Sequence, residues 1–113
     1  MKPYLYLQIA SKLRTTILRG DYAPEQQIPS IRRLAENEKC NPATVQKAMK
    51  VLEEQNLVIS CGTFGYFVIA SEQEIKELRY HESYKLVKIL FEKLGELGFS
   101  EDEIVNLFFR KDA

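Results

Sequence analysis

The sequence predicts an α+β fold that is mainly α-helical. Three observations predict it: segments with apolar residues at helical spacing fill most of the first 56 residues, two short runs rich in β-branched and aromatic residues follow, and helical spacing resumes at Ser71. We therefore expect two domains. Three helices and a β-hairpin form a head in residues 1–70, and two helices form a tail in residues 71–113.

The first helix is expected to open at Pro3 and to end at Gly20. The apolar residues between them recur every three or four positions, namely Leu5, Ile9, Leu13, Ile17 and Leu18. Glycine favours the left-handed backbone that ends many helices. The stretch 22–28 is polar and contains a proline, so we expect a loop with a short strand near Gln27 and Ile28.

Two shorter helices follow, and each opens with a capping residue. Ser30 precedes an apolar pattern that ends near Glu38, and Asn41 is followed by Pro42, a residue favoured in the first turn of a helix. The third helix is expected to end near Asn56. Two helices joined by so short a turn make a helix-turn-helix, whose second member can lie in the major groove of DNA.

Residues 57–60 and 66–69 are rich in β-branched and aromatic side chains and surround the glycine-containing segment 61–65. This pattern predicts a β-hairpin, which we call the wing (residues 57–69), with residues 61–65 as a flexible wing tip. A hairpin directly after a helix-turn-helix indicates a winged helix-turn-helix. Glycine at the tip lets the backbone approach a phosphate or the minor groove closely.

The tail is predicted to contain two helices, each opened by a capping box. Residues 71–74 and 100–103 both have the pattern Ser-x-x-Glu. The first of these helices is expected to end at Gly95 and Gly98, and its apolar stripe consists of Ile75, Leu78, Leu86, Ile89, Leu90, Leu94 and Leu97. In the last helix the inward-facing residues are expected to be Ile104, Leu107 and Phe108.

The net charge of the chain is zero, but its two parts differ. Residues 1–70 hold nine Lys and Arg against six Asp and Glu, which gives +3, and residues 71–113 hold seven against ten, which gives −3. A basic head suits contact with phosphates, although so modest an imbalance also arises by chance.

Several classes of protein are disfavoured. No apolar run reaches the roughly 18 residues that a membrane helix needs, and the N-terminus lacks the apolar core of a signal peptide, so we expect a cytoplasmic protein without a membrane partner. Cys40, Cys61 and the lone His81 lack the spacing of a metal site or a disulfide framework. We expect no cofactor, no metal and no catalytic residues.

Several segments together resemble the GntR superfamily of transcriptional regulators. The matching residues are 6–10, 17–20, 28–35, 41–45, 48, 52–53, 57–58 and 65–68, and residues 97–104 are similar to the second tail helix of the YtrA-type subfamily. The resemblance covers nearly the whole chain and implies a winged helix-turn-helix with a dimerisation tail. It also implies a transcription regulator, usually a repressor, that binds double-stranded DNA as a homodimer on a pseudo-palindromic operator.

Arg32 is the leading candidate for a DNA contact. Its guanidinium group can bind a phosphate, or O6 and N7 of guanine, through two hydrogen bonds. The resemblance implies the same role, because the family's arginine at this place in the second helix contacts DNA. The alternative is an arginine on a solvated helix face.

The other candidate DNA-binding residues lie around the helix-turn-helix and at the wing tip. They are Ser30, Asn41, Ala43, Thr44, Gln46, Lys47, Lys50, Gly62 and Thr63. Gln46 can read adenine through two hydrogen bonds, at a place where relatives often have arginine. Ser30 and Asn41 are equally explained as helix caps, and the lysines as solubilising charges. Cys61 stands where many relatives have a basic residue, which predicts a small electrostatic contribution from the wing.

The tail is too small to form an independent domain with its own pocket. Its apolar stripe is expected to pair with the tail of a second chain, and the predicted dimer interface contains Leu78, Tyr84, Leu86, Ile89, Leu90 and Leu94. The alternative is that the tail folds back on its own head. If a small-molecule effector exists, its site would lie between the tail helices or at the dimer interface.

Two other functions remain open from the sequence alone. The neutral overall charge and the weakly basic wing are compatible with a protein-interaction module that does not bind DNA. A thiol enzyme would need a reactive Cys40, which lies next to the start of the third helix.

Overall fold

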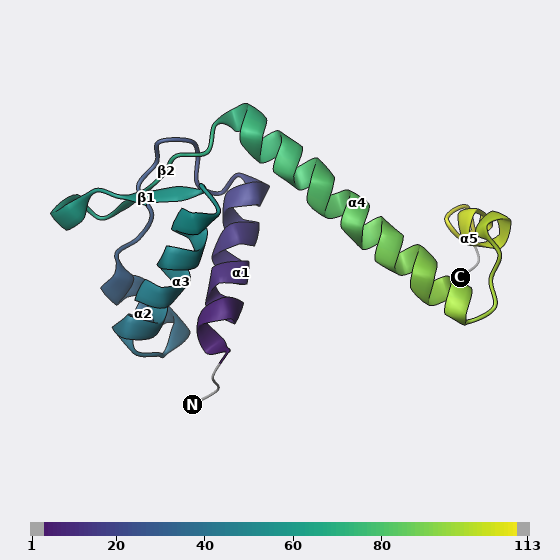
Figure 1. Ribbon diagram of the computed structural model, residues 1–113, viewed down its shortest axis with the longest axis horizontal. Helices are drawn as coiled ribbons and strands as arrows, with labels where there is room; N and C mark the ends of the chain where they lie inside the picture. The colour runs from purple at the N-terminus through teal and green to yellow at the C-terminus, as the bar shows by residue number, and fades with distance from the viewer. Residues whose placement is uncertain (1–3, 111–113) are drawn as a thin grey trace. The chain divides into compact units, whose positions relative to one another are not determined.

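The structure, a computed structural model, describes residues 4–110. Its elements in chain order are α1 (Leu5–Arg19), α2 (Ile31–Glu38), α3 (Pro42–Glu54), β1 (Val58–Ser60), the short 3-10 turn η1 (Gly62–Phe64), β2 (Tyr66–Val68), α4 (Glu72–Glu96) and α5 (Glu101–Leu107) (Figure 1). The predicted mainly helical fold with one small sheet is confirmed. The predicted start of the first helix at Pro3 lies outside the described residues.

The chain divides into two compact units. The first unit ends at Leu78 and the second unit begins at Arg79. The first unit takes in the start of α4, because Ile75 is buried in its core and Leu78 packs against that core. The functional division into a head ending at residue 70 and a tail stays a prediction.

The core of the first unit lies between α1 and α3. Four residues of α3 at positions i, i+3, i+4 and i+7 have no exposed surface, namely Val45, Ala48, Met49 and Leu52. They pack with Ile9, Leu13 and Ile17 of α1 in one apolar cluster. Since one side of α3 is fully used for this packing, the residues of its opposite side face away from the core.

The wing is an antiparallel hairpin that a third segment extends. In the hairpin Val58 pairs with Val68 and Ser60 with Tyr66. The predicted short strand near Gln27 and Ile28 is present as a single bridge between Gln27 and Phe67. The amide of Ile28 also donates to the carbonyl of Tyr66 at 2.9 Å. The segment that enters α2 is therefore joined to the wing through the backbone.

The predicted helix ends in the first unit are confirmed. Ser30 Oγ accepts a hydrogen bond from the backbone amide of Arg33 at 3.1 Å, and Asn41 Oδ1 accepts from the amide of Ala43 at 2.9 Å. Gly20 closes α1 and Asn56 follows α3, both with positive φ (91° and 60°). Each cap satisfies backbone groups that the helix itself leaves unpaired.

The helices of the predicted tail differ from expectation in two details. Gly95 lies inside α4, so its predicted role as a helix end is wrong: the helix pattern continues through it to Glu96, and Gly98 takes the left-handed conformation instead (φ 95°). In α5 only Ile104 is buried. The predicted burial of Leu107 and Phe108 is wrong, because a helix of seven residues makes only two turns and they lie at its exposed end.

Replacing Ser30 tests the cap of α2 separately from any other role of this residue. We expect Ser30→Ala to lower the free energy of unfolding by about 1 kcal/mol, because the amide of Arg33 loses its acceptor. Ser30→Asp, which keeps a capping oxygen, should stay close to wild type. Urea denaturation monitored by circular dichroism measures both. Equal stability of Ser30→Ala and wild type would contradict the capping role.

Candidate nucleic-acid interface

The outward side of α3 is a polar surface supported by the buried stripe beneath it. Ala43, Gln46, Lys47 and Lys50 are exposed, and Thr44 is half-buried. The stripe fixes the rotation of the helix, so these side chains stay on the solvent side. The surface combines two lysines with an amide and a hydroxyl, which are groups that can bind phosphates and base edges.

Arg32 and Asn41 lie at one groove beside this surface. The groove has a volume of about 530 Å³ and is lined by Arg32, Ala35, Glu36, Lys39, Cys40, Asn41 and Pro42. The side chains of Arg32 and Asn41 are both exposed. The structure thus places the leading candidate, Arg32, next to the capped start of α3.

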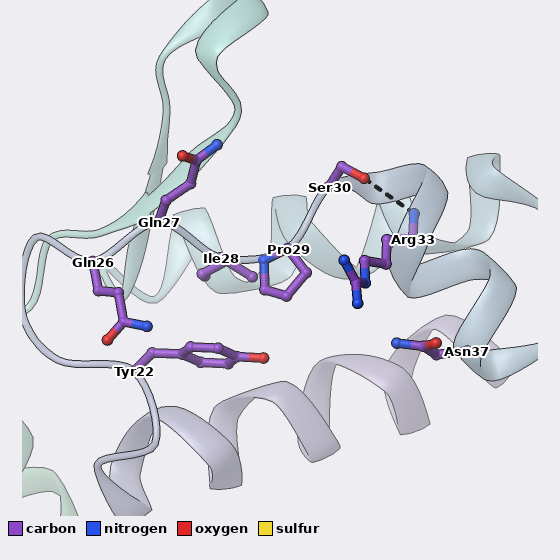
Figure 2. Close-up of a pocket in the computed structure, with 8 residues that line it drawn as sticks. All are labelled: Tyr22, Gln26, Gln27, Ile28, Pro29, Ser30, Arg33 and Asn37. Carbon is purple, nitrogen blue, oxygen red and sulfur yellow. Dashed lines mark hydrogen bonds between the residues drawn. The ribbon is translucent and has the colours of Figure 1, made fainter.

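Ser30 and Arg33 lie on another groove of α2. This groove, of about 570 Å³, is lined by Tyr22, Gln26, Gln27, Ile28, Pro29, Ser30, Arg33 and Asn37. Figure 2 shows Arg33, Asn37 and Tyr22 gathered around this space, with the cap between Ser30 and the amide of Arg33 drawn as a dashed line. Arg32 and Arg33 are adjacent in sequence but line different grooves.

Lys47 has a partner in its own chain. Its ammonium nitrogen lies 5.7 Å from the ring centroid of Tyr6 in α1, within the range of a cation–π interaction. The contact restrains a long flexible side chain at the edge of the polar surface. The role of Tyr6 could not be predicted, because in the sequence it is only one aromatic residue near the start of the first helix.

The wing tip, predicted from the sequence to be a flexible loop, contains a short helical turn. Residues 62–64 form the turn η1, and the amide of Cys61 donates to the carbonyl of Gly65 at 2.7 Å. Gly62 and Thr63 are both exposed at this turn. A side chain of the segment before α2 adds a further bond, because Gln27 Nε2 donates to the carbonyl of Phe64 at 2.7 Å.

Tyr66, which pairs with Ser60 and directly follows the wing tip, lies beside Glu53 of α3. Burial raises the pKa of the Tyr66 hydroxyl, and the neighbouring carboxylate of Glu53 in α3 raises it further through its charge and a hydrogen bond. The phenol therefore stays protonated and can donate to Glu53. Tyr66 and Gln27 therefore connect the wing with α3 and with the segment before α2.

The residues predicted for the dimer interface fall into two groups. Tyr84, Leu86, Ile89 and Leu90 are exposed in the second unit, and Leu94 is half-buried there. Leu78 differs, since it packs against the core of the first unit. Further large apolar side chains of the second unit are also exposed, namely Tyr80, Val87, Leu97, Phe99, Val105, Leu107, Phe108 and Phe109.

Two kinds of feature are absent from residues 4–110. None of the helices is both long enough and apolar enough to cross a membrane. Within residues 4–110, no three His, Cys, Asp or Glu side chains gather in a way that could hold a metal ion.

Comparisons with solved structures match this architecture. A GntR family transcriptional regulator from Listeria monocytogenes superimposes with a TM-score of 0.85 at 26% identity, covering 95% of this chain and 93% of that one. The structure of AraR(DBD) in complex with operator ORE1 is 31% identical with a TM-score of 0.56, covering 60% of this chain and 82% of that one.

Sequence comparisons lead to the same group of proteins. The HTH-type transcriptional repressor YtrA of Bacillus subtilis is 37% identical over 64 residues, which is 57% of this chain and about half (49%) of that protein. Residues 5–68 match the family described as "Bacterial regulatory proteins, gntR family". The chain therefore belongs to the gntR family, and it is a transcription regulator with a winged helix-turn-helix DNA-binding domain.

Proposed function

We propose that this regulator binds a pseudo-palindromic operator as a homodimer and represses transcription from it. The observation that carries the proposal is the outward side of α3, which is polar, exposed and flanked by Arg32 at the groove that also holds Asn41. A helix of this kind fits the major groove of B-DNA. The AraR(DBD) structure, which contains operator DNA and shares 31% identity with this chain, supports this mode of binding.

The chemistry of the side chains suggests distinct roles at the DNA. Gln46 can form two hydrogen bonds with adenine, and Thr44 can contact a thymine methyl group or a phosphate. Lys47 and Lys50 suit phosphates, which position the protein without reading sequence. Arg32 can bind either a guanine or a phosphate through two bonds.

The two capping residues can serve the helix and the DNA together. Each cap uses a side-chain oxygen as an acceptor: Ser30 Oγ for the amide of Arg33 and Asn41 Oδ1 for the amide of Ala43. The hydroxyl proton of Ser30 and the amide hydrogens of Asn41 are donors that these two bonds do not use. A phosphate oxygen beside the helix starts could accept from them, and the helix N-terminus favours an anion there.

The second unit supports the dimer. Ile104 is buried in it, while large apolar side chains, including Tyr84, Leu86 and Ile89, are exposed. Monomeric proteins rarely expose so large an apolar surface, and a symmetric pair of chains would cover it. Two heads on two half-sites would also bind far more tightly than one.

Repression is the simplest outcome of such binding. A dimer on its operator excludes other proteins from the same DNA, and this needs no further activity from the chain. YtrA, named a repressor, is similar to 64 residues of this chain. Bacterial operators lie in the cytoplasm, so the protein would act there, without catalysis and without a cofactor.

A protein-interaction module is the second candidate function. It is favoured by the wing, because residues 57–70 contain no charged side chain. The two functions are separated by selecting bound duplexes from random DNA with the full-length chain. We expect an inverted repeat whose affinity falls steeply with salt concentration. Absence of salt-dependent binding at low ionic strength would favour the interaction module.

Arg32→Ala tests the leading DNA contact. We expect affinity for the selected duplex to fall about tenfold or more, as is typical for loss of one good base contact. Arg33→Ala is the matched control, since it removes the same charge one residue away but from a different groove. Fluorescence anisotropy at fixed salt measures both. Equal losses in the two variants would mean that Arg32 acts only through its charge.

The double variant Leu86→Glu/Ile89→Glu tests the dimer. Both side chains are at least half exposed in the single chain, so we expect the variant to fold but to remain monomeric. Sedimentation should give twice the chain mass of 13.1 kDa for wild type and the single mass for the variant. Lys85→Glu/Lys88→Glu adds two carboxylates on the same helix and should stay dimeric. A dimeric Leu86→Glu/Ile89→Glu protein would place the interface elsewhere.

A further inference from the structure

The wing tip carries an exposed aromatic ring and no charge. Phe64 is 75% exposed, more than any other large apolar side chain of the described first unit. All of residues 57–70 are uncharged, so the wing has no cation with which to bind a phosphate. A phenyl ring kept in water at the end of a hairpin is a feature that DNA binding through lysines and arginines does not explain.

Three hydrogen bonds connect the backbone around Phe64 with its surroundings. The amide of Phe64 donates to the carbonyl of Cys61 at 3.1 Å, and the amide of Gly65 donates to the carbonyl of Gly62 at 3.1 Å. Gln27 Nε2 donates to the carbonyl of Phe64 at 2.7 Å. Gly65 has a φ of 93°, and a Cβ there would lie 3.1 Å from Gln27 Nε2, so only glycine suits this close approach.

The wing tip lies near the surface that we propose binds DNA. Gln27, which holds Phe64, lines the same groove as Ser30 at the start of α2. Tyr66, next to the wing tip, lies beside Glu53 of α3. When α3 occupies a major groove, an element beside it can reach the adjoining minor groove, whose walls are the apolar edges of deoxyribose rings.

We propose that Phe64 is an apolar DNA contact, placed against the deoxyribose wall of the minor groove, and that Gln27 is its positioning residue. The inference rests on the proposed function. Because an apolar contact releases no counterions, it contributes to affinity without contributing to the salt dependence. The wing then adds to binding by a different physical route from Arg32, Lys47 and Lys50.

The test measures affinity of the full-length chain for its selected duplex at several KCl concentrations. We expect Phe64→Ala to lower affinity three- to tenfold at every concentration, with an unchanged slope of log affinity against log salt. Ile69→Ala, which shortens another exposed apolar side chain at the base of the same hairpin, should behave as wild type. Phe64→Lys should steepen the slope by about 0.9 for each wing, because the new cation would meet phosphates.

Gln27→Ala tests the positioning role. It should weaken binding in the wild-type background and have no further effect in the Phe64→Ala background, since the two residues act through one contact. An effect of equal size in both backgrounds would overturn the positioning role.

The outcomes separate the inference from the function on which it rests. If wild type binds its duplex while Phe64→Ala matches it in affinity, or Phe64→Lys leaves the slope unchanged, the wing tip does not meet DNA and the inference fails alone. If Phe64→Ala alters the sedimentation mass without DNA, the ring contacts a second copy instead, and the inference fails too. If wild type binds no duplex, the proposed function itself fails.

Discussion

The packing of one side of α3 against α1 is the constraint on which the rest of the first unit depends. Val45, Ala48, Met49 and Leu52 have no exposed surface, so α3 cannot rotate without exposing part of this core. The same packing decides which side chains face outward. The polar surface with Gln46 and Lys50 is therefore a consequence of the core, and a change in that core would move the surface as well.

The local features of this fold could be predicted from the sequence because they depend on neighbouring residues. Ser30 and Asn41 cap helices through amides two or three positions away, and helical spacing identified the buried stripe of α3. The bond that connects the wing tip with the segment before α2 could not be predicted, because Gln27 and Phe64 are 37 positions apart. The exposure of Phe108 at the end of α5 could not be predicted either, because burial depends on residues distant in the sequence. Its side chain is apolar, but no described residue covers it.

In the binding that we propose, charged and apolar side chains have different roles. Arg32, Lys47 and Lys50 supply the cations of the DNA surface, and Tyr6 restrains one of them. The wing is uncharged and offers a fixed ring, so its contribution would persist at salt concentrations that weaken the cations. The second unit has a different task, since its exposed apolar side chains need a partner surface rather than a phosphate.

In the proposed complex, the outward side of α3 reads the bases of a DNA duplex. Repeating the selection from random duplexes with Gln46→Ala tests it most directly, because this side chain is exposed and takes no part in the core. If Gln46 reads a base, the preference for one base pair in each half-site should disappear while the other preferences are kept. Base preferences identical to those of wild type would contradict the role of Gln46, and loss of every preference would mean that the substitution acts on more than one base contact.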